Sequence, residues 1–287
     1  MIEVIHTRRA MATRFEVALV GRDRDHLDSV ALAALEEVAR VETVLSRYDP
    51  SAELARINRE ASHAPTLVSW EMARVLTRCQ EFHQATGGWF DPCAGHGRFG
   101  CDVLFDSDQR RIRLGHSETR LDFGGLGKGY AVDRAAELIE GFGVDRFLIH
   151  GGTSSIRARG QQASGQPWRV ALRAARPNLR EVEAAILTLR NQSLSCSANH
   201  DPGDHDPEDP NAAAVTRDPT TGEAVPSGLV VAVLANSALV AEAWSTAFLA
   251  MGPSRFGEIP LPAGITIGWN DARDGKTIPV WRWRTSE

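Results

Sequence analysis

The sequence lacks the features that are typical of secreted proteins, membrane-spanning proteins and proteins with a structural metal site. It contains only four cysteines in 287 residues, and no two of them have CxxC spacing. A disulfide framework and a structural zinc site are therefore not expected, and reduced thiols fit best. The N-terminal stretch lacks the apolar core of a signal peptide. No apolar run has the length of a membrane span, so we expect a cytoplasmic protein.

An excess of positive charge is absent as well. The formal net charge is −5 and the sequence pI is about 6.0, which argues against nucleic acid or an anionic membrane as the main partner. The hydrophobic fraction of 43% and the charged fraction of 24% are those of an ordinary globular protein. Because no linker-like stretch divides the chain, we expect one domain over residues 1–287.

One segment, HDPGDHDPEDP at residues 200–210, differs from the rest because it is acidic, rich in proline and without periodicity. Such a composition predicts an exposed loop. Its histidines and aspartates offer metal ligands, but a solvated loop is the interpretation that the composition favours.

Hydrophobic periodicity predicts strands mixed with single helices. Residues 14–20 alternate as a strand does, and apolar residues from Leu27 to Leu45 recur every three or four positions, as on one face of a helix. Ser69 is placed to cap a second helix that ends at Gly87. Further strands are expected at 103–105, 111–114, 146–150, 168–172, 185–189 and 229–234, further helices at 131–140 and 237–251, and a last hairpin between 265–267 and 277–283. This mixture favours the α+β class over a doubly wound fold.

The most distinctive stretch is Leu121–Gly152, in which a glycine-rich loop, a helix, a buried strand and a second glycine pair follow one another. Four glycines surround Lys128 in the loop. Glycine allows sharp turns and close approach of a ligand to the backbone, and the helix that follows offers unpaired N–H groups and a positive dipole end to an anion. The loop therefore predicts a phosphate site, with a helix-capping turn as the alternative. Its spacing fits neither the P-loop nor a clean dinucleotide motif.

Six segments in order resemble the ApbE family of FAD:protein FMN transferases, and together they span nearly the whole chain. They are MATRFEV (11–17), SRYDPSAELARIN (46–58), TGGWFDPCAG (86–95), LDFGGLGKGYAVD (121–133), DPTTG (218–222) and SALVAEAWSTAFLAMG (237–252). The resemblance implies a single α+β domain of mixed sheets with packed helices. It also implies FAD, Mg²⁺ and a flavin-acceptor protein, since the family transfers FMN from FAD to a Thr or Ser hydroxyl of a target protein and releases AMP. Some members instead hydrolyse FAD to FMN and AMP.

The resemblance implies a metal site on the last long helix. Glu242 and Thr246 match the family's Asp and Thr metal ligands, and they face the same way because they lie four residues apart. The third protein ligand in the family is a backbone carbonyl of the glycine loop, at the position of Gly127. These oxygen ligands suit Mg²⁺, and Mn²⁺ accepts the same ones. Without the resemblance, Glu242 is interpreted as a solvent-facing helix charge.

The resemblance further implies residues that act on FAD. Lys128 is a catalytic candidate that neutralises a phosphate, unless it pairs with Asp133 or another carboxylate. Asp122 is the second catalytic candidate; it and Asp133 either order the loop or lie near the metal. Tyr48 and Phe90 contact the flavin or adenine unless their rings pack in the core. The full set of expected FAD-binding residues is Met11, Thr13, Tyr48, Phe90, Asp91, Gly124, Gly125, Lys128, Gly151, Gly152 and Ser197.

Several positions depart from the family pattern. Glu242 replaces the metal aspartate and is one methylene longer. Val215 stands where the family has a histidine, and His200 or His205 of the adjacent loop is a possible substitute. The remaining departures are Ala12 for glycine, Cys93 for threonine, Thr153 for aspartate, and Cys196-Ser197-Ala198 for Thr-Ser-Gly. Three hypotheses stay open: an FMN transferase, a non-catalytic FAD-binding protein of the same fold, and an FAD pyrophosphatase.

Overall fold

The computed structural model describes residues 1–152, 154–172, 185–199, 216–272 and 280–286. Its main element is an eight-stranded sheet in which all neighbouring strands are antiparallel. In spatial order the strands are β1 (Ile2–Ala10), β2 (Thr13–Gly21), β6 (Phe147–Gly151), β7 (Ser155–Arg159), β10 (Gln192–Ala198), β11 (Leu229–Ala235), β12 (Thr266–Asp271) and β13 (Arg282–Thr285). The expected α+β class is confirmed, since a doubly wound fold pairs its strands in parallel.

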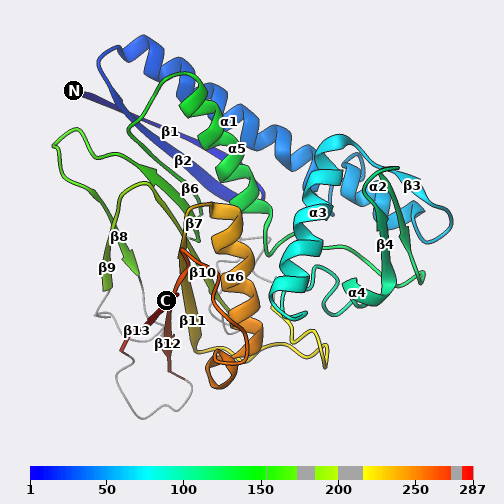
Figure 1. The fold of residues 1–287 in the computed structure, drawn as a ribbon. Coiled ribbons are helices and arrows are strands. Elements are labelled where there is room, and N and C mark those ends of the chain that lie inside the picture. Colours follow the sequence, from blue (N-terminus) through cyan, green and yellow to red (C-terminus); the bar gives the residue numbers. More distant parts are fainter. Residues whose placement is uncertain (153, 173–184, 200–215, 273–279, 287) are drawn as a thin grey trace.

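Three long helices cover one face of this sheet (Figure 1). α1 (Arg24–Leu45) lies on β1 and β2, α5 (Gly127–Gly141) lies on β6 and β7, and α6 (Ala238–Met251) lies on β10 and β11. The hairpin of β8 (Trp168–Leu172) and β9 (Ala185–Leu189) packs its apolar side chains against the central strands in a second, separate cluster. The large sheet therefore has a core on each side.

A smaller lobe lies beyond the C-terminal end of α1 (Figure 1). It contains α2 (Glu53–Glu60), α3 (Trp70–Ala85), α4 (Phe99–Asp102) and a three-stranded antiparallel sheet in the order β3 (Thr66–Leu67), β5 (Arg111–Leu114), β4 (Val103–Asp106). A short 3₁₀ helix, η1 (Pro253–Arg255), follows α6. One continuous cluster of buried side chains joins the lobe to α1, α5 and α6, so the lobe shares its core with the helices on the large sheet.

The predicted helices form where the sequence supplies an apolar face and a cap. On α1 the apolar stripe from Leu27 to Leu45 is buried, and the side chain of Asp23 caps its first turn. The Ser69 hydroxyl caps α3 by accepting from the Met72 N–H at 3.1 Å. The apolar stripe predicted α1, and the Ser69 cap predicted α3; the Asp23 cap was not predicted. None of the helices in the described ranges is both long and apolar enough to cross a membrane.

α6 is the most deeply buried helix that bears candidate site residues. Only Val240 and Thr246 are partly exposed, and every other residue of the helix is buried, as expected of a helix that is apolar on all sides. Gly252 ends it at φ +75°, with its N–H bonded to the Phe248 carbonyl at 3.0 Å. The helix thus carries the charge of Glu242 into the interior, where a carboxylate needs partners.

Some elements differ from the predictions. β1, β7, β10 and α2 were not predicted. β10 alternates serines with Leu194, Cys196 and Ala198, but the serines face α6 and are buried there, so the polar half of the pattern does not mark the solvent side as it does in an ordinary half-buried strand. α5 begins at Gly127 and not at Ala131, so part of the expected loop is helical. The last strand begins at Arg282, later than predicted, and residues 273–279 with the expected turn lie outside the described residues.

Candidate functional site

The glycine loop and α6 meet at a buried carboxylate. Lys128 Nζ lies 2.7 Å from Glu242 Oε1, and the Gly129 N–H donates to Glu242 Oε2. One turn further along α6, the Thr246 hydroxyl donates to the Gly125 carbonyl at 3.2 Å. The Glu242 side chain is 3% exposed and that of Lys128 is 24% exposed, so the pair lies at the border between core and solvent. The structure therefore brings together both predicted metal-binding side chains and the loop predicted to hold phosphate.

Close packing explains two of the loop glycines. A Cβ at Gly129 would lie 2.7 Å from the Ala238 carbonyl carbon and 2.9 Å from Leu239 Cα. A Cβ at Gly125 would lie 2.9 Å from Thr246 Cγ2. Residues 124–126 form the turn that leads into α5, with the Leu126 N–H bonded to the Phe123 carbonyl at 3.1 Å, but none of the four loop glycines has a positive φ. The glycines are needed because the loop backbone touches α6.

Asp133 fastens the two helices together. From the second turn of α5 it accepts hydrogen bonds from the Ser237 hydroxyl at 2.6 Å and from the N–H groups of Ala238 and Leu239 at 2.9 Å. A carboxylate at a helix N-terminus satisfies free N–H groups and complements the helix dipole. Arg157 lies 3.2 Å from the same carboxylate. Asp133 was expected to order the glycine loop or to lie near the metal, and these bonds instead order the start of α6. Lys128 pairs with Glu242 and not with Asp133.

A chain of serine hydroxyls supports α6 from the sheet. The Ser245 hydroxyl donates to the Glu242 carbonyl at 3.0 Å. Ser195 and Ser197 of β10 contact the Ser245 oxygen at 3.0 and 2.8 Å. Since Ser245 donates to the carbonyl, the two strand hydroxyls must donate to Ser245. Ser197, expected to bind FAD, is thus half-buried beneath the helix that carries Glu242.

The entry to the loop is held by Asp122. It pairs with Arg47 at 2.9 Å and accepts from the Gly124 N–H at 2.9 Å. Its side chain is 40% exposed, so it orders the loop from the solvent side. Tyr48, next to Arg47, has 68% of its surface exposed, and the Arg47 guanidinium lies 4.7 Å from its ring centroid. The core-packing alternative for Tyr48 is therefore wrong, and its ring remains available to a ligand.

Phe90 and Asp91 are less exposed than Tyr48. The Phe90 ring is buried and meets Phe82 edge to face, with the centroids 5.8 Å apart, which is the core-packing alternative. Asp91 accepts from the N–H groups of Cys93 and Phe99 at 2.7 and 3.1 Å, and its burial raises the pKa of its carboxyl group. The Asp122 N–H donates to the carbonyl of residue 92 at 2.7 Å. This segment therefore buttresses the glycine loop.

The first predicted segment and the second glycine pair meet at the end of β2. Met11 and Ala12 form the turn between β1 and β2, with φ of 50° and 55°. A Cβ at Gly152 would lie 2.7 Å from Thr13 Oγ1, and the Gly152 N–H donates to the Arg14 carbonyl at 2.9 Å. A Cβ at position 151 would meet the ring of a β2 phenylalanine. Met11, Thr13, Gly151 and Gly152, all expected to bind FAD, therefore form one neighbourhood.

This neighbourhood is tied to the C-terminal half of α1. The Met11 N–H donates to Glu42 Oε1 at 2.7 Å. Three residues further along α1, Leu45 Cδ1 is the nearest heavy atom to a Cβ built on Gly127, at 4.0 Å. The end of α1 therefore lies between the β1–β2 turn and the start of α5, so candidate residues far apart in sequence flank one helix end.

With this geometry in place, the family can be identified. A sequence profile of the ApbE family matches residues 11–98 and 100–259. The chain belongs to the ApbE family. It is 26% identical over 304 residues to the FAD:protein FMN transferase of Salmonella typhimurium, which covers 95% of this chain and 85% of that protein. It is 24% identical over 303 residues to the FAD:protein FMN transferase of Escherichia coli, with the same coverage of each chain.

Solved structures of ApbE proteins share the fold. The flavin transferase ApbE from Vibrio cholerae superposes with a TM-score of 0.79 at 20% identity, over 100% of this chain and 97% of that one. The apo form of the flavinyl transferase ApbE from Pseudomonas stutzeri gives a TM-score of 0.78 at 19% identity, over 100% and 95% of the two chains. The family and the fold expected from the six motifs are confirmed.

Several predicted positions of this ApbE family member cannot be placed. Thr153, Val215, His200 and His205 lie outside the described residues. Within the described ranges, no group of three or more His, Cys, Asp and Glu side chains is arranged to hold a metal ion. A cation at Glu242 would therefore depend on hydroxyl and carbonyl oxygens besides this carboxylate.

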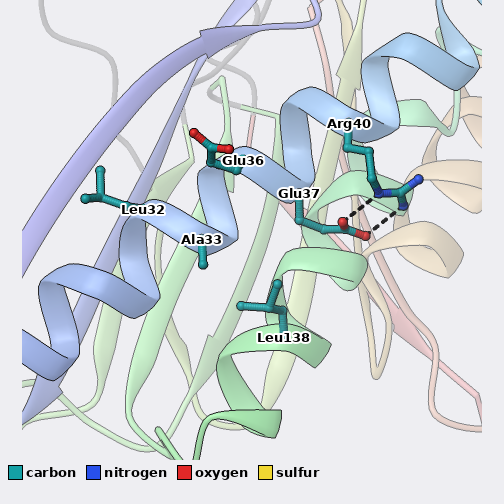
Figure 2. Close-up of a pocket in the computed structure, with 6 residues that line it drawn as sticks. All are labelled: Leu32, Ala33, Glu36, Glu37, Arg40 and Leu138. Carbon is teal, nitrogen blue, oxygen red and sulfur yellow. Dashed lines mark hydrogen bonds and ion pairs between the residues drawn. The ribbon is translucent and has the colours of Figure 1, made fainter.

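One groove in the described part of this ApbE protein lies away from these residues, between α1 and α5. Figure 2 shows its lining, which is Leu32, Ala33, Glu36, Glu37, Arg40 and Leu138, around a volume of about 520 Å³. Arg40 bonds to Glu37 at 2.7 Å and to Glu71 of α3 at 2.5 Å, and these hydrogen bonds lower the pKa of both carboxyl groups. Glu37 and Arg40 are thus paired, Glu36 lies 3.5 Å from Arg8 of β1, and none of the predicted site residues lines the groove.

Sequence reasoning missed the residues that assemble the site. Arg47, Ser245 and the contact role of Gly129 were not predicted. Gly129 alone carried a signal, because a glycine inside the first turn of a helix has a cost that must be offset by a close contact. Arg47 and Ser245 are ordinary residue types at ordinary positions, and only the tertiary structure reveals their partners.

Proposed function

We propose that this ApbE family member is an FAD:protein FMN transferase formed by a single domain over residues 1–287. In the proposed reaction, a Thr or Ser hydroxyl of an acceptor protein attacks the FMN phosphorus of FAD, the pyrophosphate P–O bond breaks, and AMP leaves. The observation that carries the proposal is the junction at Glu242, where a buried carboxylate, Lys128 and the start of α5 converge. The curated relatives named above support the transfer reaction.

The residues at this junction fit a Mg²⁺ ion. The carboxylate of Glu242 is buried, and each of its oxygens has more than one lone pair, so its present partners leave acceptor capacity. The Thr246 hydroxyl lies on the same face of α6 as Glu242, and it donates to the Gly125 carbonyl of the glycine loop. Glu242, Thr246 and the carbonyl of Gly127 would hold the ion, with substrate phosphate completing an oxygen shell. When bound, the ion supplies positive charge to the pyrophosphate.

The rest of the proposed chemistry belongs to the chain itself. The N-cap residue Leu126 provides no side-chain cap at the start of α5, and Glu242 accepts only from the Gly129 N–H there, so the positive end of the helix dipole is suited to attract a phosphate. The Lys128 ammonium adds charge where the leaving AMP phosphate becomes more negative. The exposed ring of Tyr48 offers a stacking surface for the flavin or adenine. Arg47 and Asp122 position this ring and the loop next to each other.

The test is incubation of the full chain with FAD, Mg²⁺ and a flavin-acceptor domain, followed by mass spectrometry of protein and nucleotide products. The FMN mass on a Thr or Ser of the acceptor supports the transferase. Free FMN and AMP without acceptor modification would favour the pyrophosphatase, and intact FAD would favour a binding protein. Glu242→Ala should abolish transfer, and an unaffected rate would overturn the role of Glu242.

A further inference from the structure

We propose that Lys128 and the divalent cation compete for Glu242, so that the Lys128–Glu242 ion pair weakens cation binding until substrate phosphate draws the lysine away. This inference rests on the proposed function, because it takes Glu242 as the cation's carboxylate ligand. It assigns Lys128 a second role besides neutralising phosphate, namely control of access to the metal site.

The first argument is the way in which the carboxylate is engaged. Lys128 Nζ lies 2.7 Å from one Glu242 oxygen, and the Gly129 N–H binds the other. A buried carboxylate needs such partners, since an unpaired charge there is costly. The ammonium therefore supplies, in the absence of a cation, the positive charge that Glu242 requires.

The second argument is electrostatic. A divalent cation on Glu242 would bring a second positive charge beside the ammonium, and like charges repel strongly in surroundings that exclude much of the water. The Glu242 side chain is 3% exposed, so little solvent screens this repulsion. Cation and ammonium together become favourable only when further negative charge arrives, and the pyrophosphate of FAD is such a charge.

The third argument is that the residue is a lysine. The sequence contains only two lysines, Lys128 and Lys276, against thirty arginines (32 − 2). An arginine would hold the carboxylate with a rigid, two-pronged fork, whereas a lysine is a point charge on a flexible stem. Lys128 is 24% exposed and already has a second acceptor in the Gly124 carbonyl at 3.3 Å. It can therefore leave Glu242 for a neighbouring partner without losing contact with the loop.

The side chain of Glu242 also favours competition. Glutamate is one methylene longer than the aspartate that the family motif has at this position, and the extra length extends the carboxylate from α6 to the ammonium and the Gly129 N–H. A shorter side chain would leave the ion pair stretched. Glu242→Asp should therefore loosen the hold of Lys128 on the site.

The first experiment observes the lysine directly. Full-length protein labelled with ¹⁵N at the lysine Nζ gives two side-chain NMR signals, and Lys276→Met assigns them. Titration with Mg²⁺ in the absence of FAD should move the Lys128 signal to a saturating end point and leave the Lys276 signal in place. A Lys128 signal that stays fixed while the cation binds would overturn the inference.

The second experiment measures cation affinity, with Mn²⁺ as the probe and free Mn²⁺ read by electron paramagnetic resonance. Lys128→Met should bind Mn²⁺ about tenfold more tightly than wild type, because a repelling charge is removed. Lys128→Arg, which keeps the charge, should not bind more tightly. Lys276→Met is the matched control for loss of one lysine, and Glu242→Gln should bind far more weakly than wild type.

The outcomes separate this inference from the proposed function. Equal or weaker Mn²⁺ binding by Lys128→Met, with Glu242→Gln impaired, would overturn the competition and leave the metal site standing. Wild type and Glu242→Gln with the same affinity would overturn the metal site, whatever Lys128 does. If Lys128→Met fails to fold, the NMR titration of wild type still decides the question.

Discussion

The junction of α5 with α6 and the turn between β1 and β2 solve different steric problems. At the junction, Gly125 and Gly129 have ordinary φ values and are glycine because another helix touches their backbone. At the turn, Met11 and Ala12 have positive φ values although neither is glycine. At the junction the residue type is restricted by the space beside the backbone, and at the turn it is restricted by the backbone conformation. A glycine in a sequence motif does not show which of these two restrictions applies, but substitutions can distinguish them.

Gly129→Ala should have the largest effect. The new Cβ would overlap the carbonyl group of Ala238, so α5 and α6 must separate, at a cost of about 2–3 kcal/mol of unfolding free energy. Urea unfolding measures the loss. Gly141→Ala is the matched control on the same helix, because nothing lies within 4 Å of its Cβ position; it should gain up to about 1 kcal/mol from better helix propensity. Similar behaviour of the two variants would refute the contact argument.

Asp133→Ala should come next. It removes the acceptor of three hydrogen bonds at the start of α6, which should cost about 2 kcal/mol. Because α6 carries Glu242, Mn²⁺ affinity should fall as well. Glu137→Ala, one turn further along α5 at an exposed ion pair with Arg134, should change stability by less than about 0.5 kcal/mol. An Asp133 variant as stable as this control would show that the cap is dispensable.

Ala12→Gly tests the other side of the comparison. Glycine adopts a positive φ without the clash that an alanine Cβ makes, so the variant should be more stable by about 0.5–1 kcal/mol after its greater unfolded-state freedom is counted. The melting temperature and urea midpoint should both rise. Ala33→Gly, in an ordinary turn of α1, should instead lose about 1 kcal/mol. A loss at both positions would mean that the β1–β2 turn is not strained.

Asp91→Asn should have the smallest effect and should depend on pH. Burial raises the pKa of Asp91 in the folded protein. The contribution of Asp91 to the free energy of unfolding is therefore fully present below its unfolded-state pKa of about 3.9. It is lost as the pH rises through the folded-state pKa. The stability of wild type relative to Asp91→Asn should accordingly decline from about pH 4 towards neutrality. Paired urea titrations at several pH values measure the difference, and an opposite slope would refute the role of burial.

The sequence was sufficient for elements whose pattern is local. The stripe from Leu27 to Leu45, the cap at Ser69 and the apolar run of α6 predicted their helices because each interaction is made within the element itself. β10 escaped prediction although its residues alternate between serine and apolar side chains, because the serine side is the one that packs against α6, where Ser195 and Ser197 contact Ser245. The sequence of the strand alone does not show that these serines are buried against a partner some fifty residues away.

The candidate site shows the same division. The spacing of Glu242 and Thr246 predicted that both face the same way, and the family resemblance directed that face to the glycine loop, where the structure places it. The pairing of Lys128 with Glu242, and not with Asp133, required the crossing of two helices to be known. Sequence reasoning thus identified which residues belong to the site. Which of them pair with each other depends on how α5 and α6 pack at Gly129.

The contact between Gly129 and Glu242 joins residues that are 113 positions apart. A contact between residues so far apart in sequence forms slowly, because a long loop of chain must be closed first. During synthesis the N-terminal part of the chain is made first. On a growing chain, Lys128 therefore emerges long before the carboxylate that will neutralise it. The glycine loop can form early, but its junction with α6 cannot be completed until α6 has been made and docked. At the site proposed above, binding of cation and nucleotide would require this finished junction, and a chain truncated before α6 should bind neither.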